Sequence, residues 1–346
     1  MEENTSIAVD LAKNVFEIAV SHQPGRVTER HRVSRSRLAH FFATRPPATV
    51  ILEACGSAHH WARLFESFGH RVVLLPAQYV RPYVRRNKTD RADAAGLLEA
   101  ARCAELRPVP VKTVEQQALL ALHRVRSGWM ATRTARLNTL RGLLRELGVT
   151  IPVGARQVLP KIATLIEDAD SDVPNFLRQT LATLCAEIRD LQRHIHELDA
   201  QLAALGKALP PVARLQTIRG IGPLTSTALV AVVGDVSRFR SGRQLASYLG
   251  LTPRERSSGD RRQLGRISKR GDSYLRMLLI HGARAVLWAA KSAQQPDRLQ
   301  TWALRVEQLR GHNKAAVALA NKLARVAWAV WRHQRDYQPA ATTRAA

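Results

Sequence analysis

The chain has 346 residues, 45% of them hydrophobic, and its 53 lysines and arginines against 28 acidic residues give a formal charge of +25. This hydrophobic content excludes wholesale disorder, and the length predicts two or three domains. The charge favours a polyanionic partner, with nucleic acid as the first candidate. No apolar run reaches the roughly 20 residues that span a bilayer, so no membrane partner is expected. The acidic first residues argue against a signal peptide. The three scattered cysteines argue against a disulfide framework and a zinc site, so we expect a cytoplasmic protein.

Short strands and helices alternate over residues 5–105 and predict a layered α/β domain. Strands are expected at 6–10, 15–20, 26–33, 49–53 and 71–75, with helices at 35–44 and 58–68. The first and fourth of these strands end in carboxylates, Asp10 and Glu53. If the two strands are neighbours in one sheet, both carboxylates lie at the same edge.

A second pair of acids, Asp90 and Asp93, opens a helix that runs through Ala101, and their spacing places both on one helix face. Four converging carboxylates repel one another unless cations lie between them, and oxygen-only ligands select Mg²⁺ or Mn²⁺. Two such ions about 4 Å apart can activate an attacking oxygen and stabilise a leaving one on a phosphate. In the alternative interpretation, Asp90 caps the helix and Asp93 complements its dipole or joins a surface ion pair.

From about residue 114 the pattern becomes helical. Helix 115–147 combines leucines at helix spacing with six arginines: Arg124, Arg126, Arg133, Arg136, Arg141 and Arg145. Residues 177–205 carry leucine or isoleucine in alternating steps of four and three, which is the a/d seam of a coiled coil. Two partners fit this seam. One is helix 115–147 of the same chain, and the other is a second copy of the protein in a dimer.

The last third of the chain is rich in turns and basic residues. Gly220-Ile221-Gly222 separates two predicted helices, as in a helix-hairpin-helix, whose backbone N–H groups hold a phosphate independently of base sequence. Arg219 beside the turn favours this interpretation over an ordinary interhelical turn. Residues 302–335 are expected to form a single Ala-rich helix with Leu309 and Leu323 among its core contacts.

A basic loop over residues 250–276 surrounds Ser257-Ser258-Gly259. Its cations are Arg254, Arg256, Arg261, Arg262, Arg266, Lys269, Arg270 and Arg276. A serine hydroxyl needs activation before it can attack, and guanidinium groups would stabilise charge that develops on a phosphate. From the residues alone, a phosphate-binding loop in which the serines only donate hydrogen bonds is the stronger interpretation.

Taken together, these motifs resemble the DEDD transposases of insertion-sequence family one hundred and ten, which includes Piv-like DNA invertases. The N-terminal matches are Ala8-Val9-Asp10-Leu11-Ala12-Lys13, Leu52-Glu53-Ala54-Cys55-Gly56 and residues 87–93. The C-terminal matches are Gly220-Ile221-Gly222, residues 246–254, Ser257-Ser258-Gly259 and Ser268-Lys269-Arg270-Gly271. The resemblance covers nearly the whole chain in the right order. Gly311-His312-Asn313-Lys314-Ala315 and residues 320–325 are similar to the eleven-eleven subgroup.

This resemblance implies an α/β plus α architecture. The implied domains are a RuvC-like, RNase H-fold domain at 1–108, a helical or coiled-coil linker and oligomerisation region at 109–206, a mostly helical transposase domain with a helix-hairpin-helix at 207–337, and a disordered tail at 338–346. Two Mg²⁺ ions, with Mn²⁺ as the alternative, would be held by Asp10, Glu53, Asp90 and Asp93. By motif position the nucleophile would be Ser258, although Ser257 is adjacent.

The implied reaction is attack of this serine on a DNA phosphodiester, which gives a phosphoserine and a 3′-hydroxyl, followed by strand exchange without hydrolysis. The implied nucleic-acid partners are donor and target DNA and a structured bridge RNA that pairs with both. Further copies of the protein would form a homodimer or homotetramer whose active sites combine two subunits. The active protein would be associated with the nucleoid. The expected nucleic-acid contacts are Arg124, Arg133, Arg219, Gly220, Gly222, Arg254, Arg256, Arg261, Arg262, Arg266, Lys269 and Arg270. The alternatives are a RuvC-type Holliday-junction resolvase that uses water, and a non-enzymatic helix-hairpin-helix protein.

Overall fold

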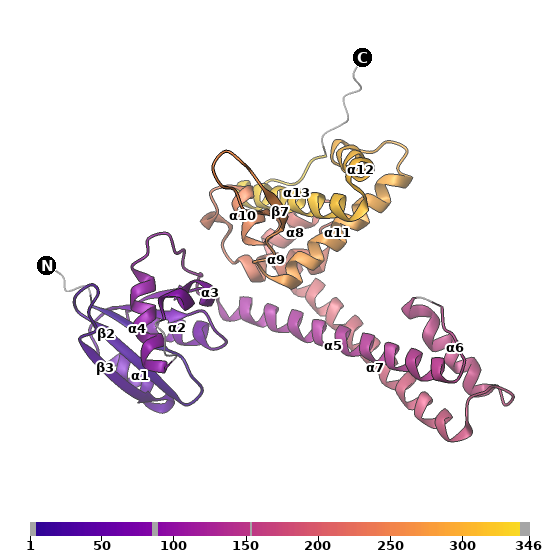
Figure 1. Ribbon diagram of the computed structural model, residues 1–346, viewed down its shortest axis with the longest axis horizontal. Coiled ribbons are helices and arrows are strands. Elements are labelled where there is room, and N and C mark those ends of the chain that lie inside the picture. Colours follow the sequence, from indigo (N-terminus) through magenta and orange to yellow (C-terminus); the bar gives the residue numbers. More distant parts are fainter. Residues whose placement is uncertain (1–4, 85–88, 153, 340–346) are drawn as a thin grey trace, which may run out of the picture. The chain divides into compact units, whose positions relative to one another are not determined.

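The computed structural model describes residues 5–84, 89–152 and 154–339, and the chain divides into two compact units, Met1–Val114 and Glu115–Ala346 (Figure 1). The first unit is α/β, and the second is almost entirely helical. The change from one to the other falls at residue 114, where the hydrophobic pattern changes its period. In the described part of the chain no helix is both long and apolar enough to cross a membrane.

A mixed five-stranded sheet forms the first unit, with the strand order β3-β2-β1-β4-β5. Its strands are β1 (Ser6–Asp10), β2 (Val15–Ser21), β3 (Glu29–Ser34), β4 (Thr49–Glu53) and β5 (Arg71–Leu75). The first three form an antiparallel meander, whereas β4 and β5 run parallel to β1. All five predicted strands are present. The third begins later than expected because Gln23 and Arg26 close a tight turn before it.

Helices cover both faces of this sheet. On one face, α1 (Arg35–Ala43) and α2 (Ala58–Ser67) bury aromatic side chains such as Phe42 and Phe65 against β1, β2 and β4. On the other face, α4 (Asp90–Ala101) packs on β1 and β2, and the short helix α3 (Ala77–Val80) contributes to the same core. This layering is consistent with the expected RNase H-like fold.

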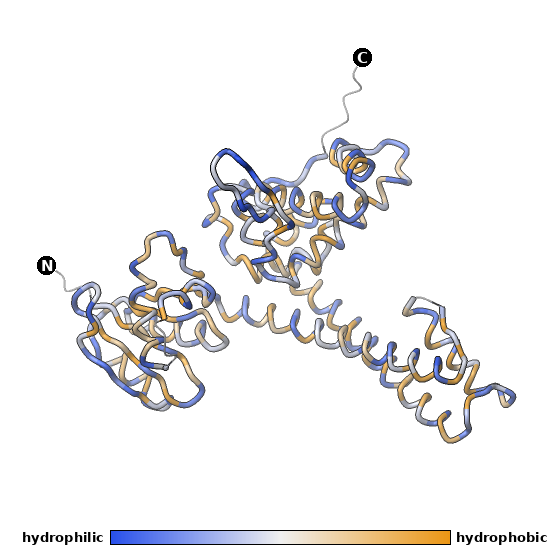
Figure 2. Tube along the Cα trace, viewed as in Figure 1, coloured by the Kyte–Doolittle hydropathy of each residue, from blue (hydrophilic) through white to orange (hydrophobic). Residues whose placement is uncertain are grey.

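A long helical hairpin begins the second unit. It consists of α5 (Val114–Glu146) and α7 (Asn175–Lys207), with α6 (Ala155–Glu167) between them. Apolar segments recur at regular intervals along both long helices (Figure 2). The predicted seam of α7 is buried against α5: Leu181 and Ile188 join Leu140 in one core, and Leu198 joins Leu119 in another. Of the two partners that the sequence allowed, the helix of the same chain is therefore the one observed.

The remaining helices enclose the largest core of the chain. They are α8 (Pro210–Gln216), α9 (Pro223–Val233), α10 (Gly242–Tyr248), α11 (Ser273–Ser292), α12 (Arg298–Arg310) and α13 (His312–His333). A two-stranded hairpin, β6 (Pro253–Glu255) and β7 (Leu264–Ile267), extends from α10 and leads into α11. Helix α9 carries no charged residue, and its few polar side chains are the small ones of Thr225, Ser226 and Thr227, so it is buried along nearly its whole length.

The prediction of one continuous helix over 302–335 is wrong. The chain breaks at Gly311, which adopts a φ of +81°, and this residue separates α12 from α13. Leu323 is buried as expected, but Leu309 lies beside the break with 70% of its surface exposed. The tail predicted at 338–346 falls almost wholly outside the described residues.

Candidate functional site

Asp10 and Glu53 lie at one edge of the sheet. Strands β1 and β4 are parallel neighbours, and Val9 is paired with Leu52, so the two carboxylates follow side by side. Ala8 lies two residues before Asp10, and Ile51 lies two residues before Glu53. Both pack in the core beneath α4. Since side chains alternate along a strand, Asp10 and Glu53 share that face of the sheet, and both are half-buried.

Asp93 faces the same side of the sheet from α4. It precedes Leu97 by four residues and Ala100 by seven, and both of these are buried against the strands. Asp93 itself is half-buried. Thr89 occupies the N-cap and accepts a hydrogen bond from the Ala92 N–H at 3.2 Å, so the alternative in which Asp90 caps the helix is wrong.

The fourth predicted acid is Asp90. It begins α4, but its side chain lies outside what the structure describes, as do Asn87 and Lys88 of the same motif. Among the described side chains, no three of His, Cys, Asp or Glu are close enough together to hold a metal ion. The donor chemistry nevertheless fits a hard divalent cation, because carboxylate oxygens on one face of the sheet are the ligands that Mg²⁺ prefers.

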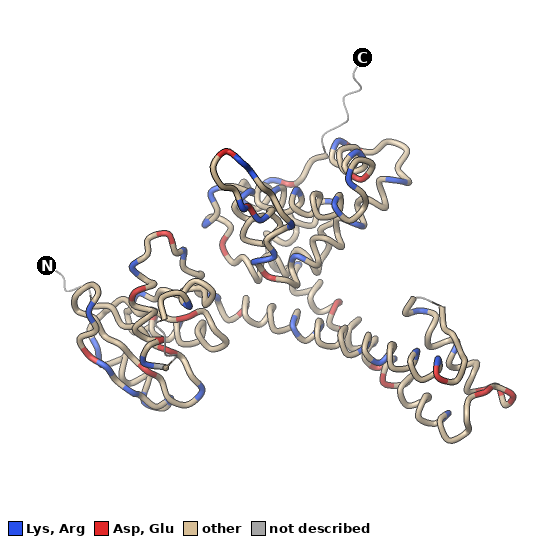
Figure 3. Tube along the Cα trace, viewed as in Figure 1, with Lys and Arg blue, Asp and Glu red and all other residues tan. Residues whose placement is uncertain are grey.

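Ser257 and Ser258 lie at the far end of the β6–β7 hairpin. Ser258 pairs with Arg261 through backbone hydrogen bonds of 3.3 and 3.2 Å in the two directions, which leaves Gly259 and Asp260 as a two-residue turn. Gly259 has a φ of +55°, and glycine at the first position of such a turn is typical of type II′. Lysines and arginines follow both arms of the hairpin in Figure 3, with an acid at the turn.

The two serines differ in their hydrogen bonds. Ser257 Oγ donates to Glu255 Oε1 at 2.8 Å and accepts from the Gln263 N–H at 3.3 Å. The Ser258 hydroxyl is exposed and forms no hydrogen bond with any residue that the structure describes. The hydroxyl of Ser257 is therefore engaged inside the hairpin, whereas that of Ser258 is available to a substrate.

Glu255 and Gln263 were not among the residues predicted from the sequence. Glu255 also accepts a hydrogen bond from Arg262 Nε at 3.1 Å. The Ser257 hydroxyl, followed by the charge of Arg262, keeps the pKa of the Glu255 carboxyl below its usual range. A signal for Glu255 was present, because residues two apart in a strand lie on the same face and Glu255 is two residues before Ser257.

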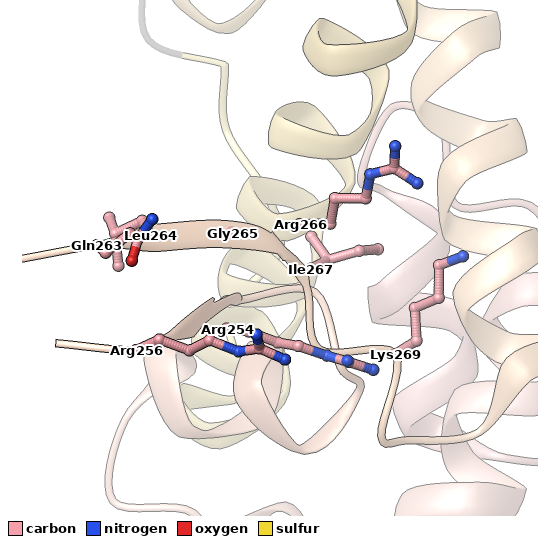
Figure 4. A pocket seen from close by; sticks show the side chains of 8 residues that line it. All are labelled: Arg254, Arg256, Gln263, Leu264, Gly265, Arg266, Ile267 and Lys269. Atoms are coloured by element: carbon pink, nitrogen blue, oxygen red, sulfur yellow. The ribbon is translucent and has the colours of Figure 1, made fainter.

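A cationic groove runs along the base of the hairpin. It is lined by Arg254, Arg256, Gln263, Leu264, Gly265, Arg266, Ile267 and Lys269 (Figure 4). Three arginines and a lysine come together there, and no acid lines the groove. Arg261 and Arg270 are exposed nearby. Guanidinium groups bind phosphate in a bidentate manner, so the groove suits a phosphodiester backbone.

Close backbone approaches fix the base of the hairpin to α10. A Cβ atom on Gly271 would lie 2.2 Å from the Tyr248 carbonyl oxygen, and one on Gly250, whose φ is +70°, would lie 2.6 Å from the Arg270 nitrogen. Only glycine fits at both positions. The Ser-Lys-Arg-Gly motif therefore has a structural role in addition to its charge.

The glycine turn between α8 and α9 is packed against α11. Gly220 has a φ of +86°, and a Cβ on Gly282 of α11 would lie 1.9 Å from the Gly220 carbonyl oxygen. Gly222 is exposed at the start of α9. Arg219 forms an ion pair with Asp297 at 3.3 Å and donates to Gln300 Oε1 at 3.1 Å. The turn thus serves helix packing, and binding of phosphate by its N–H groups stays a prediction.

The arginine-rich helix α5 uses half of its six arginines within the hairpin. Arg126 pairs with Asp199, Arg136 pairs with Glu187 at 2.9 Å, and Arg141 donates to backbone carbonyls. Arg133 is half-buried, and its Nε has no hydrogen-bond partner in the described structure. Arg124 is exposed. The helix therefore offers fewer charges to nucleic acid than its composition indicates.

Comparisons with known proteins match both units. Residues 212–298 match the model described as "Transposase IS116/IS110/IS902 family", and residues 7–149 match the DEDD transposase model of the same group. The chain is 41% identical to a probable family 20 transposase of Pseudomonas aeruginosa, over 96% of this chain and 98% of that protein. It is 38% identical to the transposase for insertion sequence element IS1111A of Coxiella burnetii, over 98% and 92% of the two chains.

The chain belongs to this family of insertion-sequence transposases. It is a DNA transposase, and the similarity to the IS1111A protein supports the eleven-eleven subgroup. The DEDD family suggests dependence on a divalent metal. A pilin gene-inverting protein of Moraxella lacunata is 27% identical over 96% of this transposase and 97% of its own length. Asp10, Glu53 and Asp93 lie in one matched segment, and Ser258 lies in the other.

Proposed function

We propose that this transposase cuts and rejoins DNA through a phosphoserine intermediate at Ser258. The observation that carries the proposal is the exposed Ser258 hydroxyl, which no described residue engages, at the end of a hairpin whose base is a cationic groove. Ser257 is less suited to attack, because its hydroxyl already donates to Glu255.

In the proposed step, Ser258 Oγ attacks the phosphorus of a DNA strand and gives up its proton to a base. The new bond joins Oγ to phosphorus, the bond from phosphorus to the 3′-oxygen breaks, and that oxygen takes up a proton to become a 3′-hydroxyl. A 3′-hydroxyl of another strand then attacks the phosphoserine, and Ser258 regains its proton. One phosphoester replaces another in each step, so no external energy source is needed.

The groove would position the phosphate for this exchange. Arg254 lies on β6 and Arg256 directly follows it, and Arg266 and Lys269 come from β7 and the residues after it (Figure 4). Fixed cations stabilise the extra negative charge of the transition state without reorganising at the moment of reaction. Arg254 also donates to the Ser268 carbonyl oxygen at 3.2 Å, which limits its motion.

Asp10, Glu53 and Asp93, with Asp90, would hold the divalent ions that this family suggests. When bound, two Mg²⁺ ions supply Lewis-acid stabilisation of phosphate oxygens. The protein's own contribution is to hold three carboxylates on one face of the sheet, with β1 and β4 fixed by their parallel pairing and α4 packed over them. Mn²⁺ would fit the same oxygen ligands.

A structured guide RNA is proposed as the element that selects donor and target DNA. The excess of 25 positive charges suits a protein that neutralises several nucleic-acid strands at once. The arginines and the lysine of the groove would contact phosphate rather than base edges, so the choice of DNA sequence would come from base pairing with the RNA. Donor and target DNA, this RNA and further copies of the chain in a dimer or tetramer are the proposed partners, with action at the nucleoid.

Three domains are proposed for these functions. They are a RuvC-like domain at 1–108, a helical and oligomerisation region at 109–206, and a transposase domain with a helix-hairpin-helix at 207–337.

Because α5 fills the α7 seam, assembly of several copies would use other surfaces. A hydrolytic resolvase is the competing function, since the carboxylates together with the divalent ions that they would hold could cut DNA with water and without a serine.

A covalent trap tests this proposal. The full-length protein is expressed with its flanking DNA and denatured in detergent, and DNA that stays attached to the recovered protein is sequenced. We expect attached DNA with the wild type and none with Ser258→Ala. Cleaved DNA without any covalent adduct would contradict the proposal and favour hydrolysis by water.

A further inference from the structure

An exposed tryptophan interrupts a basic stripe on α11. Trp288 has 75% of its surface exposed, although a tryptophan of this size is usually largely covered. Arg284 lies four residues before it and Lys291 three residues after it, so all three side chains share one helix face. None of these residues takes part in the function proposed above.

The break at Gly311 extends this stripe into a wider surface. Arg284 donates to Asn313 Oδ1 at 3.1 Å, and Lys291 forms an ion pair with Glu307 at 2.9 Å. These two contacts connect α11 to the end of α12 and to the start of α13. We call the resulting area the Trp288 surface. It comprises Arg284, Trp288 and Lys291 of α11, together with Arg310 and Lys314, which follow the contact residues Glu307 and Asn313 in the chain.

The Trp288 surface is cationic and partly apolar. Trp288 supplies the exposed apolar area, and Arg310 and Lys314 are exposed. One acid, Glu307, takes part in the contacts between α11 and α12. The pKa of its carboxyl is lowered first by the hydrogen bond from Lys291 and then by that from His312. The Trp288 surface therefore carries a net positive charge around its exposed tryptophan.

The chemistry of this surface selects its partner. A second copy of the same surface would bring like charges together. An unpaired nucleotide instead offers a flat base that stacks on an indole ring and phosphates that meet lysine and arginine. Duplex DNA keeps its base faces stacked inside the helix, whereas loops of a folded RNA display them.

We propose that the Trp288 surface binds an unpaired loop of a folded RNA, with one base stacked on Trp288 and the adjoining phosphates on Arg310 and Lys314. This inference rests on the guide RNA of the proposed function and assigns it a contact surface. It also gives a role to the Gly-His-Asn-Lys motif at 311–314, which lies far in the sequence from the serine hairpin. The glycine turns the chain so that the start of α13 reaches the same surface as α11, where Asn313 accepts from Arg284.

The chain contains a matched control for the tryptophan. Phe176 at the start of α7 is 85% exposed, but the turn before it carries Asp168, Asp170 and Asp172. Figure 3 shows this acidic turn between α6 and α7. An aromatic side chain of similar exposure in acidic surroundings should repel RNA, so Phe176→Ala reports on loss of exposed apolar area alone.

The experiment uses the full-length protein expressed together with its insertion element. Cells are irradiated with ultraviolet light, the protein is purified and digested with trypsin, and nucleotide adducts are located by mass spectrometry. We expect a ribonucleotide adduct on the peptide of residues 285–291. RNA that copurifies with Trp288→Ala should fall by about tenfold, while Trp288→Phe and Phe176→Ala retain nearly all of it.

Three results would overturn the inference. Equal amounts of RNA on the wild type and on Trp288→Ala would show that the Trp288 surface does not bind the RNA, and would not contradict the proposed guide RNA. Wild-type protein that retains no RNA would contradict both the proposed guide RNA and its proposed binding to the Trp288 surface. A deoxyribonucleotide adduct on the same peptide would assign the surface to a displaced DNA strand instead.

Discussion

Ser257 Oγ lies 2.8 Å from Glu255 Oε1 and donates its hydrogen bond to that carboxylate, whereas the neighbouring Ser258 hydroxyl has no such partner among the described residues. The two serines are adjacent in the sequence, but successive residues of an extended chain point to opposite sides. The hairpin therefore separates their roles. Ser257 stabilises the hairpin, and Ser258 is presented to the substrate.

Ser257→Ala should reduce recombination without abolishing it. The substitution removes the hydrogen bonds to Glu255 and Gln263, which loosens the hairpin but leaves the Ser258 hydroxyl in place. Loss of one hydrogen bond to a charged group in an exposed hairpin predicts a decrease of about tenfold. A plasmid assay with donor and target sites measures it, with Ser258→Ala as the inactive control. Full loss in Ser257→Ala together with activity in Ser258→Ala would move the nucleophile to Ser257.

Asp93→Asn should abolish strand cleavage while DNA binding is preserved. Asn keeps the size of the side chain on the sheet-facing stripe of α4 but removes the charge that would hold a divalent cation. Cleavage of a labelled duplex in Mg²⁺ and a gel-shift titration measure the two properties separately. Glu99→Gln, on the same helix but paired with Arg102, is the matched control. Normal cleavage by purified Asp93→Asn would exclude this carboxylate from the site.

His123 should make stability depend on pH. It is buried between the Thr227 hydroxyl at 3.1 Å and the Tyr274 hydroxyl at 3.2 Å, and burial, followed by the charge of Arg126, lowers its pKa to about 4. The unfolded chain binds a proton near pH 6.5, so stability is complete above that pH and declines as the pH falls towards 4.

The expected loss between pH 7 and pH 4 is on the order of 3 kcal/mol, at 1.36 kcal/mol per pKa unit. Urea denaturation at several pH values measures it. His123→Gln retains an amide that can bond to both hydroxyls and cannot take up a proton, so its stability should vary less over this range. Identical pH profiles for the two proteins would show that His123 does not control acid stability.

The two ion pairs between α5 and α7 should differ in their contribution to stability. The Arg126 side chain is 12% exposed where it pairs with Asp199, whereas Arg136 and Glu187 are 41% and 40% exposed. Arg126→Ala leaves Asp199 without its partner in a partly buried position and should cost about 2–3 kcal/mol. Arg136→Ala should cost about 0.5 kcal/mol, because exposed pairs contribute little. Thermal unfolding measures both, and equal losses would refute the distinction.

Several parts of the fold follow from local pattern. Runs of apolar residues at 6–10, 49–53 and 71–75 predicted strands, and these strands are present. The carboxylates Asp10 and Glu53 were expected at one edge if their strands were neighbours, and the parallel pairing of β1 with β4 meets that condition. The limits of α9 agree with the predicted helix through Val233. These predictions succeed because period and turn residues are properties of a few consecutive positions.

Other features depended on distant contacts. The heptad seam of α7 could not identify its partner, and the cores with Leu119 and Leu140 show that α5 fills it. Leu309 was expected in the core because its spacing matches that of Leu323, but the break at Gly311 leaves it exposed. The six arginines of the helix over 115–147 were not distinguished by their pattern, but Arg126 and Arg136 pair with acids more than 50 residues away.

The sequence by itself determined the family, through acids at strand ends, a serine motif in a basic loop and a charge that demands a polyanion. It determined the five strands of the first unit and the long helices α5 and α7, because their periods are local. Only the tertiary structure decided that the seam of α7 closes on α5 within the chain, that Arg126 and Arg136 of α5 pair with acids of α7, and that the start of α13 meets the face of α11 that carries Trp288. Each of these depends on which residues far apart in the chain come into contact, and a local pattern carries no information about that choice.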